Sequence, residues 1–273
     1  MNSIVLLHAL SLVAYLGAGA SVAVSLAAGQ RTAPRFGVVL IGVAVVAQAI
    51  GLALFTARFH ELPLVGLAAS LSTLAFLIGA ALFGATLLRA VRPVALVLIP
   101  LIALLLAISL TLGLVPGGAP SQFRGIWFAA HVMLAFAAYS SLALAFAAGL
   151  LYLLQFRALK GKNFGRAFRF FPPLETLDRL RQGALWTGLP TLTFALLLGW
   201  AWTVRFHNSF APQNPQVIWG VVTWFVFIAA LAARRGEGGA ERRAATVAVA
   251  GFAVVVVTYM LLRILMPDGR SFL

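Results

Sequence analysis

Eight long stretches of apolar residues follow one another along the chain, separated by short segments that carry most of its charge. About 20 apolar residues suffice to cross the hydrocarbon core of a bilayer as a helix. A helix also satisfies its own backbone N–H and C=O groups, which lipid cannot do. The pattern therefore predicts an all-α, polytopic integral membrane protein with about eight transmembrane helices in a single membrane domain. The predicted helices cover residues 4–28, 36–57, 63–88, 93–115, 126–155, 184–206, 216–233 and 244–266, with a basic cytoplasmic loop at 157–183.

The composition of the chain agrees with a lipid environment. Of the 273 residues, 62% are hydrophobic and 10% are charged, whereas a soluble domain carries about 25% charged residues. The chain contains no cysteine, which excludes disulfides, thiolate metal ligands and thiol redox chemistry in the chain itself. Its formal net charge of +14 does not predict a nucleic-acid partner, because the basic residues flank the apolar stretches as membrane topology requires. Membrane lipid is the partner that these cations predict.

The basic residues are divided unequally between the two sides of the membrane. Fifteen of the 20 Lys and Arg residues lie after the first, third, fifth and seventh predicted helices, and five lie on the opposite side. The side richer in Lys and Arg faces the cytoplasm. The sequence therefore predicts a multi-pass protein of a bacterial cytoplasmic (inner) membrane with both termini outside. Basic and aromatic residues alternate in 157–183, which favours attachment to the anionic inner leaflet over RNA binding.

In this orientation all four histidines, His8, His60, His131 and His207, lie near the outer side. Histidine is the commonest metal ligand, and haem iron takes one or two of them. His131 is the first candidate because Trp127, four residues earlier on the same helix face, would suit a flat porphyrin. His60 is the next candidate as a haem or metal ligand, followed by His8 and His207. The alternative is that the histidines are only hydrogen-bonded and that Trp127 belongs to the interfacial aromatic belt.

The acidic residues exclude several classes of membrane protein. All six lie in loops or at helix ends, so no carboxylate is placed in mid-membrane, where a proton-driven transporter would usually need one. A Gly-rich phosphate-binding loop with a Lys is also missing from the sequence, which counts against an ATPase. Paired carboxylates for hydrolysis are missing on the outer side as well. The sequence therefore predicts a protein that is not an enzyme.

Several segments resemble the cytochrome c assembly family, which includes the CcsA/ResC haem proteins and the HemX-like proteins. His131 lies in WFAAHVMLAFAAYSSLALAFAAGLLYLLQ (127–155), which resembles the family's helix that opens with a haem-ligand histidine. The family's next loop and helix are similar to PPLETLDRL (172–180) and GLPTLTFALLLGWAW (188–202) of this chain. The signature of the HemX-like branch resembles SFAPQNPQVIWGVVTWFVF (209–227). His60 stands at the family's conventional histidine in RFHELPLVGLAASLSTLAFLIG (58–79).

The chain departs from the complete haem carriers of this family in two segments. The family's tryptophan-rich outer segment is taken to cradle haem, and here Trp219 and Trp224 remain of its tryptophans. Asn-Pro-Gln at 214–216 replaces the usual Asp-Pro-Lys. Arg270 stands where the family has a C-terminal outer histidine. A guanidinium cannot ligate iron, although it can pair with a haem propionate, so the resemblance is to the HemX-like branch more than to a complete haem synthetase.

The resemblance implies that the protein binds or presents haem at the outer face during assembly of c-type cytochromes, with an apocytochrome or an assembly protein as partner. Two alternatives stay open. HemX-like relatives are associated with control of glutamyl-tRNA reductase, which would make this chain a membrane regulator of tetrapyrrole (haem) synthesis with a tetrapyrrole-synthesis enzyme as partner. The other alternative is a structural subunit whose haem site has decayed.

Overall fold

Long apolar helices build the protein, as the sequence predicts. The computed structural model describes residues 2–30, 35–116, 125–162, 165–207, 215–234 and 239–265, and over these residues it contains helices and no strand. In chain order the elements are α1 (Asn2–Ala27), α2 (Arg35–Phe59), α3 (Leu67–Thr86), the short 3-10 helix η1 (Arg89–Val94), α4 (Ala95–Leu112), α5 (Ile126–Lys160), α6 (Arg166–Phe170), α7 (Leu174–His207), α8 (Pro215–Ala232) and α9 (Ala240–Leu265).

The lengths and compositions of these helices confirm a polytopic membrane protein. Six of them, α1 to α5 and α7, are long and apolar enough to cross a bilayer. A shorter apolar helix, Val217–Ala232, forms most of α8, and α9 is 26 residues long. Many of their large apolar side chains are exposed on the surface of the bundle, as contact with lipid allows.

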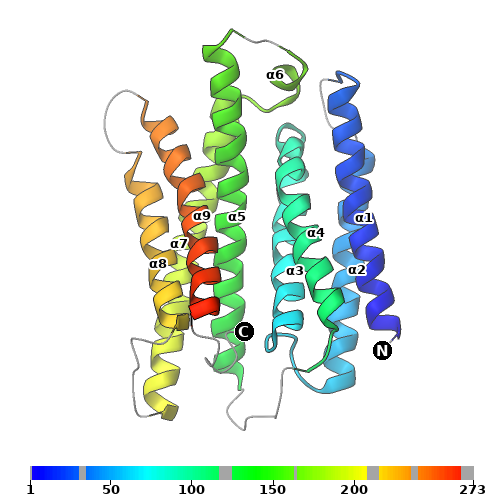
Figure 1. Ribbon diagram of the computed structural model, residues 1–273, viewed down its shortest axis with the longest axis vertical. Helices are drawn as coiled ribbons and strands as arrows, with labels where there is room; N and C mark the ends of the chain where they lie inside the picture. Colours follow the sequence, from blue (N-terminus) through cyan, green and yellow to red (C-terminus); the bar gives the residue numbers. More distant parts are fainter. Residues whose placement is uncertain are drawn as a thin grey trace.

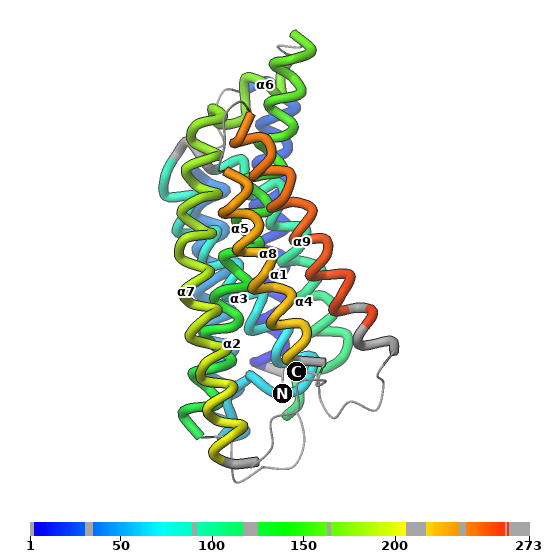
Figure 2. Tube along the Cα trace, turned by 90° about the vertical axis from the view of Figure 1, so that its left-hand side faces the viewer, coloured from blue at the N-terminus to red at the C-terminus, as the bar shows by residue number. Residues whose placement is uncertain are grey.

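The helices form two groups that lie side by side (Figure 1). One group contains α1 to α4, and the other contains α7, α8 and α9. Helix α5 joins them because it packs against α7 and α9 on one side and against α3 on the other. The first residues of α1 and α5 and the last residues of α9 lie at the same end of the bundle, which Figure 2 also shows. We call this the outer end, following the predicted orientation, and the opposite end, where α6 lies, the inner end.

The inner segment 157–183, predicted as a loop, is mostly helical. Helix α5 continues to Lys160, α6 forms a single short helix, and α7 begins at Leu174 rather than at 184. The prediction of a loop was wrong because charged residues mark where a helix leaves the membrane, and not where the helix itself ends.

This inner segment is attached to the protein itself. Arg166 donates a hydrogen bond to the carbonyl of Ala27 at 2.9 Å, and Gln155 donates one to the carbonyl of Phe168 at 3.1 Å. Phe170 is 3% exposed and belongs to the core of the α1–α4 half. The segment therefore ties α5 to the inner end of α1, and Phe170 does not face lipid.

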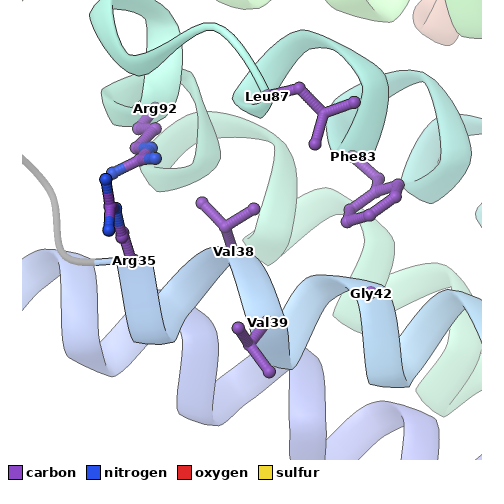
Figure 3. Close-up of a pocket in the computed structure, with 7 residues that line it drawn as sticks. All are labelled: Arg35, Val38, Val39, Gly42, Phe83, Leu87 and Arg92. Atoms are coloured by element: carbon purple, nitrogen blue, oxygen red, sulfur yellow. The ribbon is translucent and has the colours of Figure 1, made fainter.

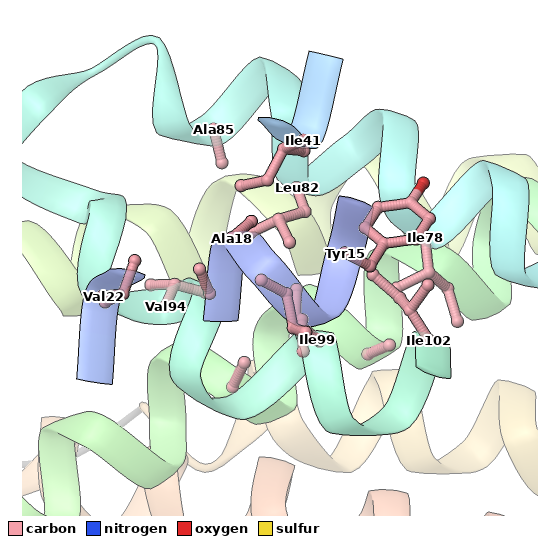
Figure 4. Packing of buried hydrophobic residues seen from close by; sticks show 14 of the residues in the cluster. Tyr15, Ala18, Val22, Ile41, Ile78, Leu82, Ala85, Val94, Ile99 and Ile102 are labelled. Atoms are coloured by element: carbon pink, nitrogen blue, oxygen red, sulfur yellow. The ribbon is translucent and has the colours of Figure 1, made fainter. Parts of the chain in front are cut away.

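The core of the α1–α4 half consists of alanines and larger aliphatic side chains around Tyr15 (Figure 4), and a few buried polar side chains lie between the helices. Tyr15 and Ala18 of α1 are completely buried. The Tyr15 hydroxyl donates to Gln48 Oε1 of α2 at 3.4 Å, and Gln48 Nε2 donates to the carbonyl of Ser72 of α3 at 3.0 Å. Hydrogen bonds and close packing of small residues hold membrane helices together, because lipid is as apolar as the helices. These contacts therefore link α1, α2 and α3.

Gly79 of α3 offers a test of this packing. A Cβ atom at this position would collide with the Tyr15 hydroxyl. Gly79→Ala is therefore expected to destabilise the protein by about 1–3 kcal/mol, the usual cost of overpacking a core. Gly84→Ala in the same helix is the matched control, because a Cβ there meets no atom within 4 Å. The measurement is the Tm in detergent, and equal values for the two variants would contradict the packing described here.

A buried ion pair lies at the inner end of α7, where this helix packs against α5 and α8. Asp178 of α7 accepts a hydrogen bond from Arg181 one turn later, and its other oxygen lies 3.3 Å from Arg234 Nη2, just after α8. The side chains of Arg181 and Asp178 are 1% and 7% exposed. Arg181 passes α5 at Gly149, where a Cβ would lie 3.7 Å from Arg181 Cδ. Asp178 therefore pairs with Arg181 within α7 and with Arg234 just after α8, while Arg181 packs against α5.

Candidate functional site

His131 lies near the start of α5 at the outer end, where it faces α7. Its Nδ1 lies 2.6 Å from the carbonyl oxygen of Ala195. A carbonyl can only accept, so Nδ1 carries the proton and donates it, which leaves Nε2 with the lone pair that a metal needs. Nε2 makes no hydrogen bond to the described residues and is not enclosed. Histidine ligands in metalloproteins are oriented in this way by an N–H bond to a carbonyl or a carboxylate.

Gly199 allows the imidazole of His131 to approach α7. A Cβ at this position would lie 2.6 Å from His131 Cε1 and 2.9 Å from Nδ1, closer than non-bonded carbon atoms can come. Ala195 and Gly199 are four residues apart, so they occupy the same face of α7. The carbonyl of one and the missing side chain of the other together fix the ring. Sequence reasoning missed both residues, because a small residue in an apolar helix carries no signal of the partner it will face.

Trp127 stands where a planar ligand of His131 could reach it. Its side chain is 59% exposed, one turn before His131 on α5. Beside it, the rings of Phe128 and Trp202 lie 6.1 Å apart and cover the outer part of the α5–α7 contact. The site thus has an exposed indole, an oriented imidazole and an aromatic pair next to them.

The two other predicted tryptophans are tied into the packing of the same half. Trp219 donates from Nε1 to the carbonyl of Val255 at 3.0 Å, and its ring centroid lies 4.4 Å from that of Tyr139. Trp224 donates from Nε1 to Thr193 Oγ1 at 3.0 Å. Both indole N–H groups therefore donate hydrogen bonds to neighbouring helices. A role of these two tryptophans in a haem cradle remains a prediction.

The other histidines occupy the outer end in different surroundings. His8 is completely buried, donates from Nδ1 to Ile4 of its own helix at 2.8 Å, and lies against Gly51 of α2. Its Nε2 is enclosed and has no hydrogen-bond partner in the described part of the chain. Haem could reach His8 only if the contact between α1 and α2 opened. His60 is exposed just after α2, with a left-handed backbone at φ 53°.

His207 ends α7 at the outer end, and its side chain is outside the described part. Arg270 lies outside the described residues altogether. Groups of three or more His, Asp or Glu side chains that could hold a bare metal ion do not occur among the residues that the structure describes.

Residues 59–267 match the family model of the cytochrome c assembly protein. The chain belongs to this family. The cytochrome c biogenesis protein CcsA of Guillardia theta is 30% identical over 149 residues, which cover 49% of this chain and 50% of that protein. The CcsA protein of Gloeobacter violaceus is 36% identical over 96 residues, which cover 35% and 28% of the two chains. That of Trichormus variabilis is 36% identical over 86 residues, covering 32% and 24%.

This cytochrome c assembly protein therefore aligns with half or less of the length of these relatives. The match confirms the resemblance drawn from the segments around His60 and His131, and it supports a role in cytochrome c biogenesis. The HemX-like branch stays a prediction. The relatives named here are cytochrome c biogenesis proteins, and they give no support to a regulator of tetrapyrrole synthesis.

Proposed function

We propose that this cytochrome c assembly protein binds haem at the outer face of a bacterial cytoplasmic membrane, with His131 as an axial ligand, and presents it for attachment to an apocytochrome. The main support for the proposal is the hydrogen bond from His131 Nδ1 to the carbonyl of Ala195. This bond orients the ring and keeps Nε2 available to bind iron. The family membership makes haem the ligand to expect at such a histidine.

The residues of the chain would act by holding and orienting haem. His131 Nε2 would donate its lone pair to the iron, while Ala195 and Gly199 keep the ring in place. The exposed indole of Trp127 would offer a flat apolar surface to the porphyrin. Haem itself is the cargo, and the attachment reaction takes place between haem and the apocytochrome. We propose accordingly that the chain is not an enzyme and that it works with an apocytochrome or with another assembly protein.

The proposal is tested by the haem content of the purified protein. The wild type is expected to show a Soret band after purification or after reconstitution with haem. Gly199→Ala is expected to lower haem affinity about tenfold, because a methyl group would push the imidazole away from the carbonyl that orients it. Gly183→Ala on the same helix is the matched control, since a Cβ there meets no atom within 4 Å. Equal haem affinities in two well-folded variants would count against the site.

The proposed orientation has its own test. A reporter fused after Leu273 is expected to be active outside the cytoplasm, and the same reporter inserted at Gly161 is expected to be active inside it. The reason is the excess of Lys and Arg in the segments at the inner end. A cytoplasmic reporter after Leu273 would place His131 on the cytoplasmic side and would contradict the proposed presentation of haem to an exported apocytochrome.

A further inference from the structure

A groove lies at the inner end of the α1–α4 half, between α2 and the connection from α3 to α4 (Figure 3). Its volume is about 410 Å³. Its lining is apolar along its length and basic at one end. The apolar part contains Val39, Gly42, Phe83 and Leu87, and the basic end is formed by Arg35 and Arg92.

The two arginines bring positive charge together at one place. Arg35 is the first residue of α2, and Arg92 lies in η1. Figure 3 shows their guanidinium groups directed towards each other. Two like charges repel more strongly at the edge of an apolar layer than in water, and the positive end of the α2 dipole adds to the repulsion. Among the described residues, the groove is lined by no acidic side chain, so an anion between the two groups would be stabilised by both of them.

The apolar part of the groove runs from this basic end towards the middle of the membrane. Gly42 lies two helical turns beyond Arg35, about 10 Å further along the axis of α2. It has no side chain, and Phe83 comes close enough that a Cβ there would lie 3.0 Å from its ring. Val39 and Leu87 are 59% and 62% exposed, so the groove is open to lipid. A surface that is basic at the membrane boundary and apolar below it matches the polarity of a phospholipid.

We propose that this groove binds one anionic phospholipid of the inner leaflet. The phosphate lies between the guanidinium groups of Arg35 and Arg92, which present paired N–H donors to its oxygens. One acyl chain lies along the exposed apolar lining formed by Val39 and Leu87. This lipid site lies at the opposite end of the bundle from His131, and it does not depend on haem binding.

The test is lipid retention by the full-length protein. The protein is released from nanodiscs that contain equal amounts of phosphatidylglycerol and phosphatidylcholine, and the retained lipids are identified by native mass spectrometry. The wild type is expected to retain one phosphatidylglycerol in preference to phosphatidylcholine. Arg35→Gln is expected to lower this preference about fivefold, the effect of one lost cation at a membrane surface. Gly42→Leu keeps both arginines but fills the apolar part, and it is expected to lower retention as well.

Arg58→Gln is the matched control. Arg58 lies on the same helix at the outer end, where its guanidinium stands 5.7 Å from the centre of the Phe59 ring, and the variant is expected to retain lipid as the wild type does. Equal retention of the two lipids by the wild type would overturn the proposal, and so would an equal loss in Arg35→Gln and Arg58→Gln. If inorganic phosphate displaced the lipid and Gly42→Leu had no effect, the site would bind free phosphate instead, which would also overturn it.

Discussion

Asp178→Ala is expected to destabilise the protein by about 3–5 kcal/mol, the cost of leaving a buried charge without its partner. Arg181 is 1% exposed and its ion-pair partner is Asp178. Its Nε already has no hydrogen-bond partner among the described residues. Without the carboxylate, the guanidinium would stay charged between α5 and α7 at the inner end. The expected result is a much lower Tm in detergent and a large loss of folded protein during purification.

The matched control for Asp178→Ala is Glu175→Ala. Glu175 is also acidic and lies one turn earlier in α7. Glu175 pairs with Arg179 at 2.5 Å, but the two side chains are 75% and 76% exposed. Exposed pairs of this kind contribute little to stability because water and salt screen them. The control is therefore expected to keep the Tm of the wild type. A similar Tm for both variants would mean that the charge of Arg181 is solvated and that the ion pair is not buried as described.

The second large effect is expected at the proposed haem site. His131→Ala should remove the Soret band from the purified protein, because the methyl group that remains cannot ligate iron. His8→Ala is the control histidine at the same end of the bundle. Its imidazole is enclosed between α1 and α2, so haem content should not change in a folded His8→Ala variant. Haem absorption is measured against protein concentration for each variant.

The second axial ligand can be identified with the same measurement. His60 is exposed and His207 ends α7 at the outer end, so each is a candidate. If the wild type is low-spin with two histidine ligands, the variant that converts it to a high-spin spectrum identifies the second one. Retention of the low-spin spectrum in both His60→Ala and His207→Ala would exclude both residues as that ligand.

The sequence predicted the parts of the fold that depend on one helix at a time. Apolar length identified the membrane-spanning segments, since the thickness of the bilayer sets a minimum that few other structures require. The excess of basic residues at alternate helix ends agrees with the structure, in which the start of α1 and the end of α9 lie at the same end of the bundle (Figure 1). His131 and Trp127 were predicted to share a helix face because their spacing alone determines it.

Contacts between helices could not be predicted in the same way. The carbonyl of Ala195, 64 positions away in sequence, and the absent side chain of Gly199 orient His131, and no local pattern identifies such contacts. The buried position of Arg181 was also missed, because its sequence neighbours are those of a solvated basic segment. Its burial arises only where α7 packs on α5 beside Gly149.

Rescue by imidazole distinguishes ligation of haem iron by His131 from a general effect of the substitution on folding. His131→Ala is purified and reconstituted with haem, with and without added imidazole, and its Soret absorbance is compared with that of the wild type. The variant is expected to bind little haem alone and to recover a Soret band when free imidazole occupies the place of the missing ring. A His131→Ala variant with the haem content and spectrum of the wild type in the absence of imidazole would contradict ligation by His131.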